Sequence, residues 1–396
     1  MKKMTVRDIE VAGKRVLVRV DFNVPLDGAT GSITDDSRIR ASLPTIRYLL
    51  EHKAKVILMS HLGRPKGKPA SEFSLAPVAE RLSKILRKKV VFAANCIGPA
   101  VERSAATMKV GDILLLENLR FHPEEEAGEE NFAKALARLG DVFVNDAFGT
   151  SHRAHASIAT ITKYLPAVAG LLLEKEINTL GSLLKNPARP FISIFGGAKV
   201  SDKVGVLKNI MNKVDCLLIG GGMAVTFLKA RSYEVGTSAV EIESLAIAGE
   251  LIKQAEKSCV ELVLPIDVVV TEEINNKASG QLVLVSAIPP NKKIVDIGPE
   301  TLDVFRKELE KSQTVFWNGP MGVHEIPQFA RGTVTLARLL AKLKAKTIVG
   351  GGSTAEVIET LDLSDNITFV STGGGASLEF LGGKQLPGVV SLLDKK

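Results

Sequence analysis

The stretch RVLVRV at residues 15–20 is the first of several short segments with an apolar centre that decide the fold. Its β-branched residues favour a strand, and the unbroken apolar centre favours burial on both faces. Residues 41–52 follow with helical spacing, and KVILMS at residues 55–60 is a second strand of the same kind. Buried strands separated by helices predict a parallel sheet that helices cover on both faces.

The same rhythm continues through the chain, whose 396 residues are typical of two domains. Two more strands are predicted in the first half, and the pattern then restarts with six more. The further predicted strands are residues 112–117, 141–145, 191–195, 216–219, 261–265, 314–317, 347–349 and 368–371. The sequence therefore predicts an α/β protein of two doubly wound parallel-sheet domains, facing each other across a cleft and joined by a helix.

The boundary between the domains is not marked by a Gly/Ser-rich linker. Leu165 and Pro166 instead precede residues 167–184, which are predicted to be helical and contain Glu174-Lys175-Glu176. We expect an N-terminal domain, an interdomain helix, a C-terminal domain, and a tail that packs back near the N-terminal domain. These segments are residues 1–168, 169–185, 186–380 and 381–396, respectively.

Polar and cationic side chains follow the predicted strands of the first half, where ligands bind in open parallel sheets. The segments are Asp21-Phe22-Asn23-Val24-Pro25, His61-Leu62-Gly63-Arg64-Pro65, residues 118–122 with Arg120, and residues 146–157 with His152, Arg153 and His155. Arg38 is expected in a polar loop beyond the first strand. Arginine suits phosphate and carboxylate, so a small ligand with several anionic groups is predicted. The histidines lack the spacing typical of a metal site.

Glycine-rich turns follow the predicted strands of the second half. They are Gly196-Gly197-Ala198-Lys199, with Lys203 one turn further on, and the triplets at residues 220–222, 350–352 and 373–375. Glycine lets backbone N–H groups approach an oxyanion, and a helix N-terminus favours negative charge. A single triplet is explained equally well by a tight turn, whereas three triplets beside a Gly-Gly-x-Lys segment indicate phosphate binding.

Two common nucleotide-binding signatures are missing, since neither G-x-x-x-x-G-K-[ST] nor a post-strand G-x-G-x-x-G occurs. One domain with clustered cations and another with glycine turns imply two ligands. A phosphoryl transfer needs its donor and acceptor in line and shielded from water, and a closing cleft would provide both.

Composition limits the remaining classes of function. The formal charge of +7 suits polyanions, but three Tyr and one Trp offer little for stacking on nucleic-acid bases. The three cysteines, Cys96, Cys216 and Cys259, are widely spaced and favour a reducing compartment. No signal-peptide core or membrane-spanning run occurs. We expect a cytoplasmic protein that binds neither nucleic acid nor membrane.

Taken in order, the segments at the strand ends resemble the phosphoglycerate kinase family over nearly the whole chain. The matching segments are RVDFNVP (19–25), HLGRP (61–65), ENLRF (117–121), GGAKVSDK (196–203), GGGMA (220–224), WNGPMG (317–322) and STGGGAS (371–377). The resemblance implies an ATP-dependent phosphotransferase of glycolysis with a carboxyl group as acceptor. It would transfer a phosphoryl group from 1,3-bisphosphoglycerate to ADP, giving 3-phosphoglycerate and ATP. The resemblance also implies Mg²⁺ on the nucleotide, a monomer, and hinge-bending closure of the domains.

The resemblance implies a role for each matching residue. The substrate-binding residues would be Arg19, Asp21, Phe22, Asn23, Arg38, His61, Leu62, Gly63, Arg64, Arg120 and Arg153. The nucleotide-binding residues would be Lys199, Lys203, Gly220, Gly221, Gly222, Gly298, Asn318, Pro320, Glu325, Gly351, Gly352, Ser353 and Thr354, with Glu325 on the ribose. Arg38, Lys199 and the backbone at Gly373 and Gly374 would neutralise the transferring group.

Three positions depart from the family pattern. Ser353 stands where the family commonly has an aspartate associated with magnesium, Ser151 where alanine is usual, and His324 where phenylalanine is usual. A serine hydroxyl is a weaker ligand for a hard cation than a carboxylate, so contact of the chain with magnesium stays open, with Thr354 as a further donor.

Two other interpretations remain at this stage. The first is a non-catalytic homologue that binds nucleotide or phosphorylated metabolites, which Ser353 favours and the intact Arg38, Lys199 and Lys203 oppose. The second is a kinase acting on another small acid.

Overall fold

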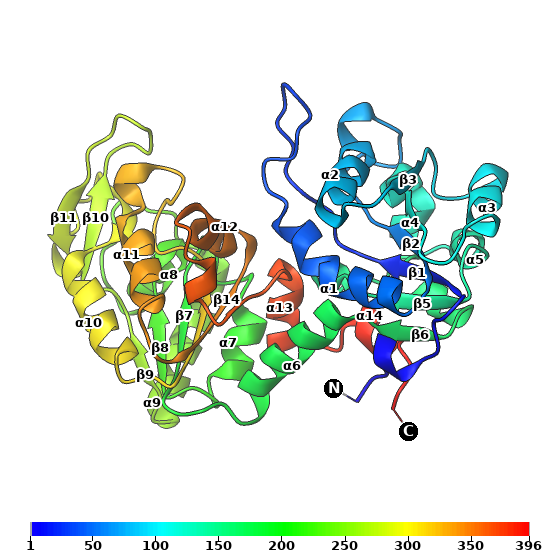
Figure 1. The fold of residues 1–396 in the computed structure, drawn as a ribbon. Coiled ribbons are helices and arrows are strands. Elements are labelled where there is room, and N and C mark those ends of the chain that lie inside the picture. The colour runs from blue at the N-terminus through cyan, green and yellow to red at the C-terminus, as the bar shows by residue number, and fades with distance from the viewer. Residues whose placement is uncertain (1, 396) are drawn as a thin grey trace. The chain divides into compact units, whose positions relative to one another are not determined.

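The computed structural model describes residues 2–395. The chain forms two compact units (Figure 1). Unit 1 holds the chain up to Asn178 together with the segment that starts at Gln385, and unit 2 holds residues 179–384. Helix α6 (Leu171–Lys185) carries the chain from unit 1 into unit 2.

The strands of unit 1 are β1 (Arg15–Arg19), β2 (Lys55–Met59), β3 (Val90–Ala93), β4 (Ile113–Leu116), β5 (Val142–Asn145) and β6 (Ala167–Ala169). Its helices, besides the start of α6, are α1 (Ser37–Glu51), α2 (Ala76–Leu86), α3 (Pro99–Ala106), α4 (Pro123–Ala127), α5 (Glu130–Ala137) and α14 (Pro387–Val390). Its 3-10 turns are η1 (Val6–Asp8), η2 (Ser71–Phe73), η3 (Leu119–Phe121), η4 (Phe148–Thr150) and η5 (Thr160–Lys163).

The strands of unit 2 are β7 (Phe191–Phe195), β8 (Cys216–Ile219), β9 (Glu261–Val263), β10 (Asp267–Thr271), β11 (Gln281–Leu284), β12 (Lys293–Ile297), β13 (Thr314–Asn318), β14 (Lys346–Gly350) and β15 (Phe369–Val370). Its helices are α7 (Val204–Ile210), α8 (Gly221–Ala230), α9 (Leu245–Lys257), α10 (Pro299–Leu309), α11 (Arg331–Leu340), α12 (Gly352–Thr360) and α13 (Gly374–Leu381). Its 3-10 turns are η6 (Ile242–Ser244), η7 (Val285–Ala287), η8 (Pro327–Phe329) and η9 (Ser364–Asn366).

Each unit is built on a six-stranded parallel sheet, which confirms the predicted α/β class. The strand order is β3-β4-β2-β1-β5-β6 in unit 1 and β15-β14-β13-β7-β8-β9 in unit 2. In unit 1, Val16 lies between Val56 of β2 and Val142 of β5 and is fully buried. In both sheets the chain starts at a central strand, moves toward one edge and later returns on the other side. That reversal defines a topological switch point, between β1 and β5 in unit 1 and between β7 and β13 in unit 2.

The helix predicted over residues 167–184 is wrong at its start. Residues 167–169 form the edge strand β6, which pairs in parallel with β5, and α6 begins only at Leu171. The buried Asp146 ends the strand pairing by accepting the N–H groups of Leu172 and Leu173 at 2.9 and 3.2 Å. A Cβ on Gly170 would overlap the Asp146 carboxylate. Tertiary contacts therefore override the helical propensity of the alanines.

The C-terminal segment completes unit 1. Met4 donates its N–H to Leu393 O at 2.8 Å, and Lys3 forms an isolated bridge with Asp394. Further along the segment, Gly388 N–H donates to Ser151 O at 2.9 Å. These bonds attach the end of the chain to its beginning and to the loop after β5.

A three-stranded antiparallel sheet in unit 2, ordered β11-β10-β12, was not predicted. The strand expected at residues 261–265 ends at Val263, since Pro265 lacks an N–H for the ladder, and β10 begins at Asp267. The outer strand β11 is largely exposed and shows no clean alternation, so it lacks the pattern that identifies a strand.

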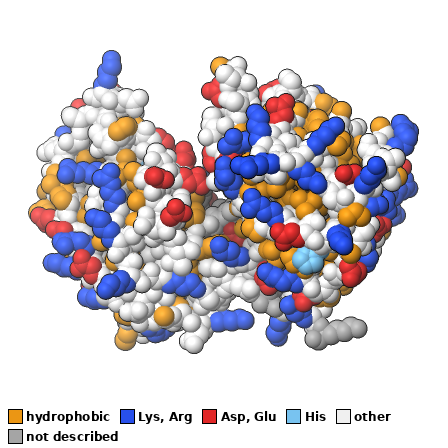
Figure 2. Space-filling model, in the orientation of Figure 1, with side chains coloured by type: hydrophobic (Ala, Val, Ile, Leu, Met, Phe, Trp, Pro, Cys, Tyr) orange, Lys and Arg blue, Asp and Glu red, His pale blue; other side chains and the backbone are white. Residues whose placement is uncertain are grey.

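Within residues 2–395, no helix has the length and apolar character needed to span a membrane. On the face drawn in Figure 2, Lys and Arg side chains are dispersed over both units and interleaved with other residue types.

Candidate active site

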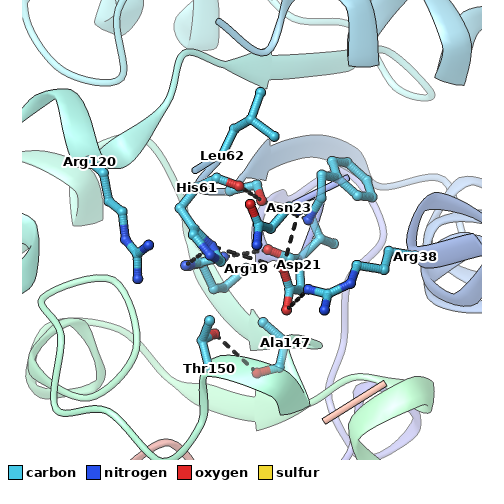
Figure 3. A network of polar contacts seen from close by, with 12 residues as sticks. Arg19, Asp21, Asn23, Arg38, His61, Leu62, Arg120, Ala147 and Thr150 are labelled. Carbon is cyan, nitrogen blue, oxygen red and sulfur yellow. Dashed lines mark hydrogen bonds and ion pairs between the residues drawn. The ribbon is translucent and has the colours of Figure 1, made fainter. Parts of the chain in front are cut away.

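The predicted cationic residues of unit 1 lie at the carboxyl ends of its central strands. Arg19 is the last residue of β1, His61 follows β2, Arg120 lies in η3 after β4, and Arg153 follows β5. These strands surround the switch point between β1 and β5, where open parallel sheets bind ligands. Figure 3 shows Arg38 and Arg120 on opposite sides of the group formed by Asp21 and His61.

An ion pair joins Asp21 to Arg38, with Arg38 Nη1 2.9 Å from Asp21 Oδ2. The expectation that Arg38 lies in a loop is wrong, because it occupies the first turn of α1. Burial alone would raise the pKa of Asp21, but the charges of Arg38 and Arg19, together with the hydrogen bond from the Asn23 N–H, hold the pKa below its usual value. Asp21 is therefore an anion that orients a partly exposed guanidinium at the end of the sheet.

His61 is a neutral ring at neutral pH. It is 4% exposed, and this burial lowers its pKa well below the usual value; Asp21 opposes the shift and Arg19, Arg120 and Arg38 add to it. Its Nδ1 lies 3.3 Å from Arg19 Nη2 and 4.0 Å from Asp21 Oδ1.

The backbone of the loop after β2 is held by two asparagines. Asn23 Oδ1 accepts the Gly63 N–H at 2.8 Å, and Asn118 Oδ1 accepts the Leu62 N–H at 3.2 Å. Gly63 adopts a φ of +60°, and a Cβ there would overlap the ring of Phe73, so a glycine is required. The carbonyl of Gly63 accepts Arg120 Nη1 at 2.8 Å, which ties Arg120 to this loop.

The other predicted substrate residues differ in exposure. Arg64 and Arg153 are exposed and available to a ligand, whereas the Phe22 and Leu62 side chains are buried in the core. Arg120 is buried, and burial lowers its pKa, as does the nearby charge of Arg153, against the opposing charges of Glu126, Glu125 and Asp21.

Arg19 lies deeper than the other arginines, with 1% of its surface exposed. Its Nε donates to Ser157 Oγ at 2.9 Å, its Nη1 to the carbonyl of Val20, and its Nη2 contacts His61. Burial lowers its pKa, and Glu125 and Asp21 counteract this. The guanidinium is thus engaged by the protein rather than presented to solvent.

Two buried groups beside Arg19 were missed by sequence reasoning. Ser157 donates from Oγ to Glu125 Oε1 at 2.5 Å, and Glu125 is fully buried. Glu125 is the middle one of three glutamates that follow Pro123, and such a run reads as the exposed first turn of a helix. Nearby, burial lowers the pKa of His155 to about 4, an effect that Arg120, Arg19 and Arg153 increase.

In unit 2 the loops at the switch point are in direct contact. Gly196 donates its N–H to Asn318 O at 2.9 Å, and Gly197 donates to Pro320 O at 2.8 Å. A Cβ on Gly319 would overlap the Gly196 carbonyl. The turn after β7 and the turn after β13 are therefore packed backbone to backbone.

Three helices of unit 2 begin at the predicted glycine triplets. Helices α8, α12 and α13 have Gly220, Gly351 and Gly373 as their N-cap residues. A Cβ on Gly374 would lie 4.0 Å from the backbone nitrogen of Gly352, so the N-termini of α12 and α13 lie side by side. Unpaired N–H groups of two adjacent helix ends favour an anion.

Lys203 is a buried cation at the same edge. It is 8% exposed, and a Cβ on Gly197 would lie 3.3 Å from its Nζ. Burial lowers its pKa, while Asp202 opposes the shift. In the described part of the chain Lys203 has no ion-pair partner, and a buried ammonium without a partner is a binding group for an anion. Lys199, four residues earlier, is exposed.

The remaining predicted nucleotide-binding residues differ in their exposure and in the groups that they contact. Asn318 Nδ2 donates to Gly350 O at 2.8 Å, and Pro320 is partly exposed. Glu325 has a 70% exposed side chain, with Oε2 3.2 Å from His324 Nδ1. Gly298 caps α10, where its backbone packs against the Asp267 carboxylate.

The side chains near the glycine turns offer few oxygen donors for a metal ion. Ser353 is exposed in the first turn of α12, whereas the buried Thr354 uses Oγ1 to accept the Gly319 N–H at 2.7 Å. Among residues 2–395, the one group of side chains close enough to share an ion is Cys216, Glu261 and Glu308. Cys216 and Glu261 begin β8 and β9, so this group lies at the opposite edge of the sheet. The donors near α12 fit a metal held mainly by phosphates and water.

Comparison with known proteins identifies the relatives of the chain. A family model described as phosphoglycerate kinase matches residues 6–384. Proteins named phosphoglycerate kinase from Moorella thermoacetica and Dictyoglomus turgidum are each 55% identical, with 100% of both chains covered. The solved phosphoglycerate kinase from Coxiella burnetii has 42% identity and a TM-score of 0.86, and that from Pyrococcus horikoshii has 32% identity and a TM-score of 0.87. Each structural match covers 98% of both chains.

Each parallel sheet carries groups suited to anions at its switch point, and the relatives match the chain from end to end. Together these findings define a kinase of the α/β class. The chain belongs to the phosphoglycerate kinase family.

Proposed function

We propose that the protein catalyses reversible phosphoryl transfer from 1,3-bisphosphoglycerate to ADP, giving 3-phosphoglycerate and ATP, as a step of glycolysis. The observation that carries this proposal is that each unit has a different set of anion-binding groups at its own switch point. Unit 1 presents arginines, and unit 2 presents helix N-termini and, at the same sheet edge, the buried Lys203. The full-length relatives of the chain support the same reaction.

In unit 1, the phosphoglycerate ligand would bind the cations at the carboxyl ends of the strands. Arg38 is oriented by Asp21, and Arg120 is tied to Gly63, so both guanidiniums are held in place before the ligand arrives. Arg64 and Arg153 would contribute exposed charge. Asn23, Leu62 and Gly63 would act through the backbone of the loop that they build.

In unit 2, the nucleotide phosphates would meet Lys203 and the N-termini of α12 and α13. The turn at residues 220–222 would border the adenine together with Gly298, and Asn318, Pro320 and Glu325 would line the remainder. Ser353 and the phosphates would hold Mg²⁺, which supplies charge neutralisation between the phosphate groups when it is bound.

The chemistry requires no nucleophilic side chain or general base, because the carboxylate of 3-phosphoglycerate is itself the attacking group. The protein must align the two ligands and neutralise the charge that moves between them. We assign this neutralisation to Arg38, Lys199 and the backbone N–H groups at Gly373 and Gly374. In-line transfer further requires hinge-bending closure of the units on their ligands. The reaction calls for no nucleic acid or membrane, and we propose a cytoplasmic monomer.

A coupled assay of ATP-dependent phosphorylation of 3-phosphoglycerate tests this proposal, with and without Mg²⁺. Replacing Arg38 with alanine should lower kcat by about 10²-fold or more, since one lost transition-state donor costs about 3–4 kcal/mol. The matched control is Arg40→Ala, two residues along α1, whose exposed guanidinium pairs with Asp36. Binding of both ligands by the wild type without turnover would instead show a non-catalytic binding protein.

A further inference from the structure

The fully buried Glu125 has no role in the proposed transfer reaction. Its Oε2 accepts the Ser157 N–H at 2.9 Å, and its Oε1 accepts the Ser157 hydroxyl at 2.5 Å. Both carboxylate oxygens therefore act as acceptors, as in the ionised form. Burial raises the pKa of Glu125, and Arg19 and Ser157 oppose the rise. A buried anion is destabilising unless it is fully paired, so the hydrogen bonds that Glu125 accepts are needed to keep it in the core.

The hydrogen bonds continue from Ser157 to the active-site histidine. Because the hydroxyl hydrogen of Ser157 points to Glu125, its oxygen is left to accept Arg19 Nε at 2.9 Å. The other end of the guanidinium lies 3.3 Å from His61 Nδ1. A guanidinium has no acceptor atom, so Nδ1 must accept this bond and the proton of the neutral ring must be on Nε2.

The geometry points to Glu125 and Ser157 as positioning residues that act through Arg19 to hold His61 as a neutral Nε2–H donor. This inference rests on the proposed function for the identity of the ligand, the phosphoglycerate anion. Within residues 2–395, no hydrogen bond to His61 Nε2 is found, so the N–H is free to donate to that anion.

The position of Arg19 decides whether His61 Nδ1 accepts a hydrogen bond from Arg19 or turns its own proton toward Asp21. The charged groups that face His61 are Asp21, Arg19, Arg120 and Arg38. Asp21 Oδ1 lies 4.0 Å from Nδ1, which is too far for a hydrogen bond. If Arg19 were displaced, Nδ1 would take up a proton toward Asp21, and the lone pair of Nε2 would face the anionic ligand. Ser157 and Glu125 prevent this by fixing the far end of the Arg19 guanidinium.

Two variants test the inference, Ser157→Ala and Glu125→Gln, with Ser312→Ala as the matched control. Ser312 is a buried hydroxyl of unit 2 that donates to Leu309 O at 2.7 Å and has no part in the site. Histidine-labelled ¹⁵N NMR of the ligand-free protein reads the ring directly, since only six histidines are present and a His61→Gln variant identifies the signal.

In the wild type and the control, we expect His61 to carry its proton on Nε2 and to remain neutral down to pH 6. In both test variants, the proton should shift toward Nδ1 or the ring should titrate above pH 6. The KM for 3-phosphoglycerate should rise about tenfold, as for loss of a hydrogen bond of about 1.4 kcal/mol. The KM for ATP should stay within about twofold, because unit 2 is untouched.

Unchanged His61 signals in the variants would overturn the inference, as would an equal rise of both KM values, which indicates a general loss of structure. If Ser157→Ala does not fold, Glu125→Gln, which preserves the shape of the side chain, decides alone. The NMR measurement needs no turnover, so it stands apart from a failure of the proposed reaction.

Discussion

Replacing Asp296 with asparagine tests how a buried carboxyl group controls the pH dependence of stability in unit 2. Asp296 lies in β12 and is 1% exposed, and its Oδ2 accepts the N–H of Gly332 at 2.7 Å in the first turn of α11. Its Oδ1 accepts the N–H of Ile297 at 2.9 Å. Burial raises its pKa to about 7, although both hydrogen bonds lower it. The folded state therefore binds a proton that the unfolded chain releases near pH 4.

The sign of the effect follows from this difference. Between pH 4 and 7 the folded state holds more protons than the unfolded state, so stability falls as the pH rises toward 7. A pKa difference of about three units corresponds to at most about 4 kcal/mol, of which about 2.5 kcal/mol falls between pH 5.0 and 7.5. Asparagine cannot ionise. We therefore expect the free energy of unfolding of Asp296→Asn, relative to the wild type, to increase by about 2.5 kcal/mol over this range.

The single tryptophan of the chain provides the assay. Trp317 is fully buried in unit 2, so its fluorescence during urea unfolding reports the unit that contains Asp296. The buried but non-titrating variant Ser312→Ala should follow the pH profile of the wild type. If the difference between Asp296→Asn and the wild type is constant from pH 5.0 to 7.5, the carboxyl group is ionised throughout, and the reasoning from burial fails.

Three further outcomes are expected. Lys203→Met should raise the KM for ATP by about 10- to 100-fold, as for loss of a charge-assisted hydrogen bond, and should raise the melting temperature by removing an unpaired buried charge. Gly63→Ala should lower the free energy of unfolding, measured by urea unfolding, by about 2 kcal/mol, because residue 63 has a left-handed backbone and its Cβ would overlap the Phe73 ring. The KM for 3-phosphoglycerate should also rise, while the KM for ATP should not. Ser353→Asp should lower the Mg²⁺ concentration for half-maximal activity several-fold, as measured by titration, and an unchanged value would show that this side chain does not contact the metal.

The central strands of the two parallel sheets could be predicted because each has a predominantly apolar centre. Residues 16–18 of β1 and 191–195 of β7 are buried on both faces, and such runs are visible in sequence. The edge strands β3 and β11 were missed because each is partly exposed and shows no clear period, whereas the three buried residues of β6 were assigned to the helix that follows. Which strand each of these edge strands pairs with depends on the fold and cannot be identified from the sequence.

The site residues at strand ends could also be placed, since parallel strands bring their carboxyl ends to one edge. How deeply each of these side chains is buried could not be predicted. Arg19 and Arg38 look alike in sequence, but one is fully engaged by Ser157 and His61, and the other is partly exposed beside Asp21. Arg19 and Ser157 are 138 residues apart, so only the folded chain shows that they share a hydrogen bond. The role of Glu125 was hidden for the same reason.

The return of the C-terminal segment to unit 1 sets an order for biosynthesis. Unit 2 is one continuous stretch, residues 179–384, and can finish folding as soon as it has left the ribosome. Unit 1 is interrupted by it and lacks the partners of Met4 and Asn145 until Leu393 and Gly388 have been translated. The first half of the gene therefore encodes the part of the protein that is completed last, and a ribosome that stops a few codons early releases a chain whose N-terminal unit is unfinished.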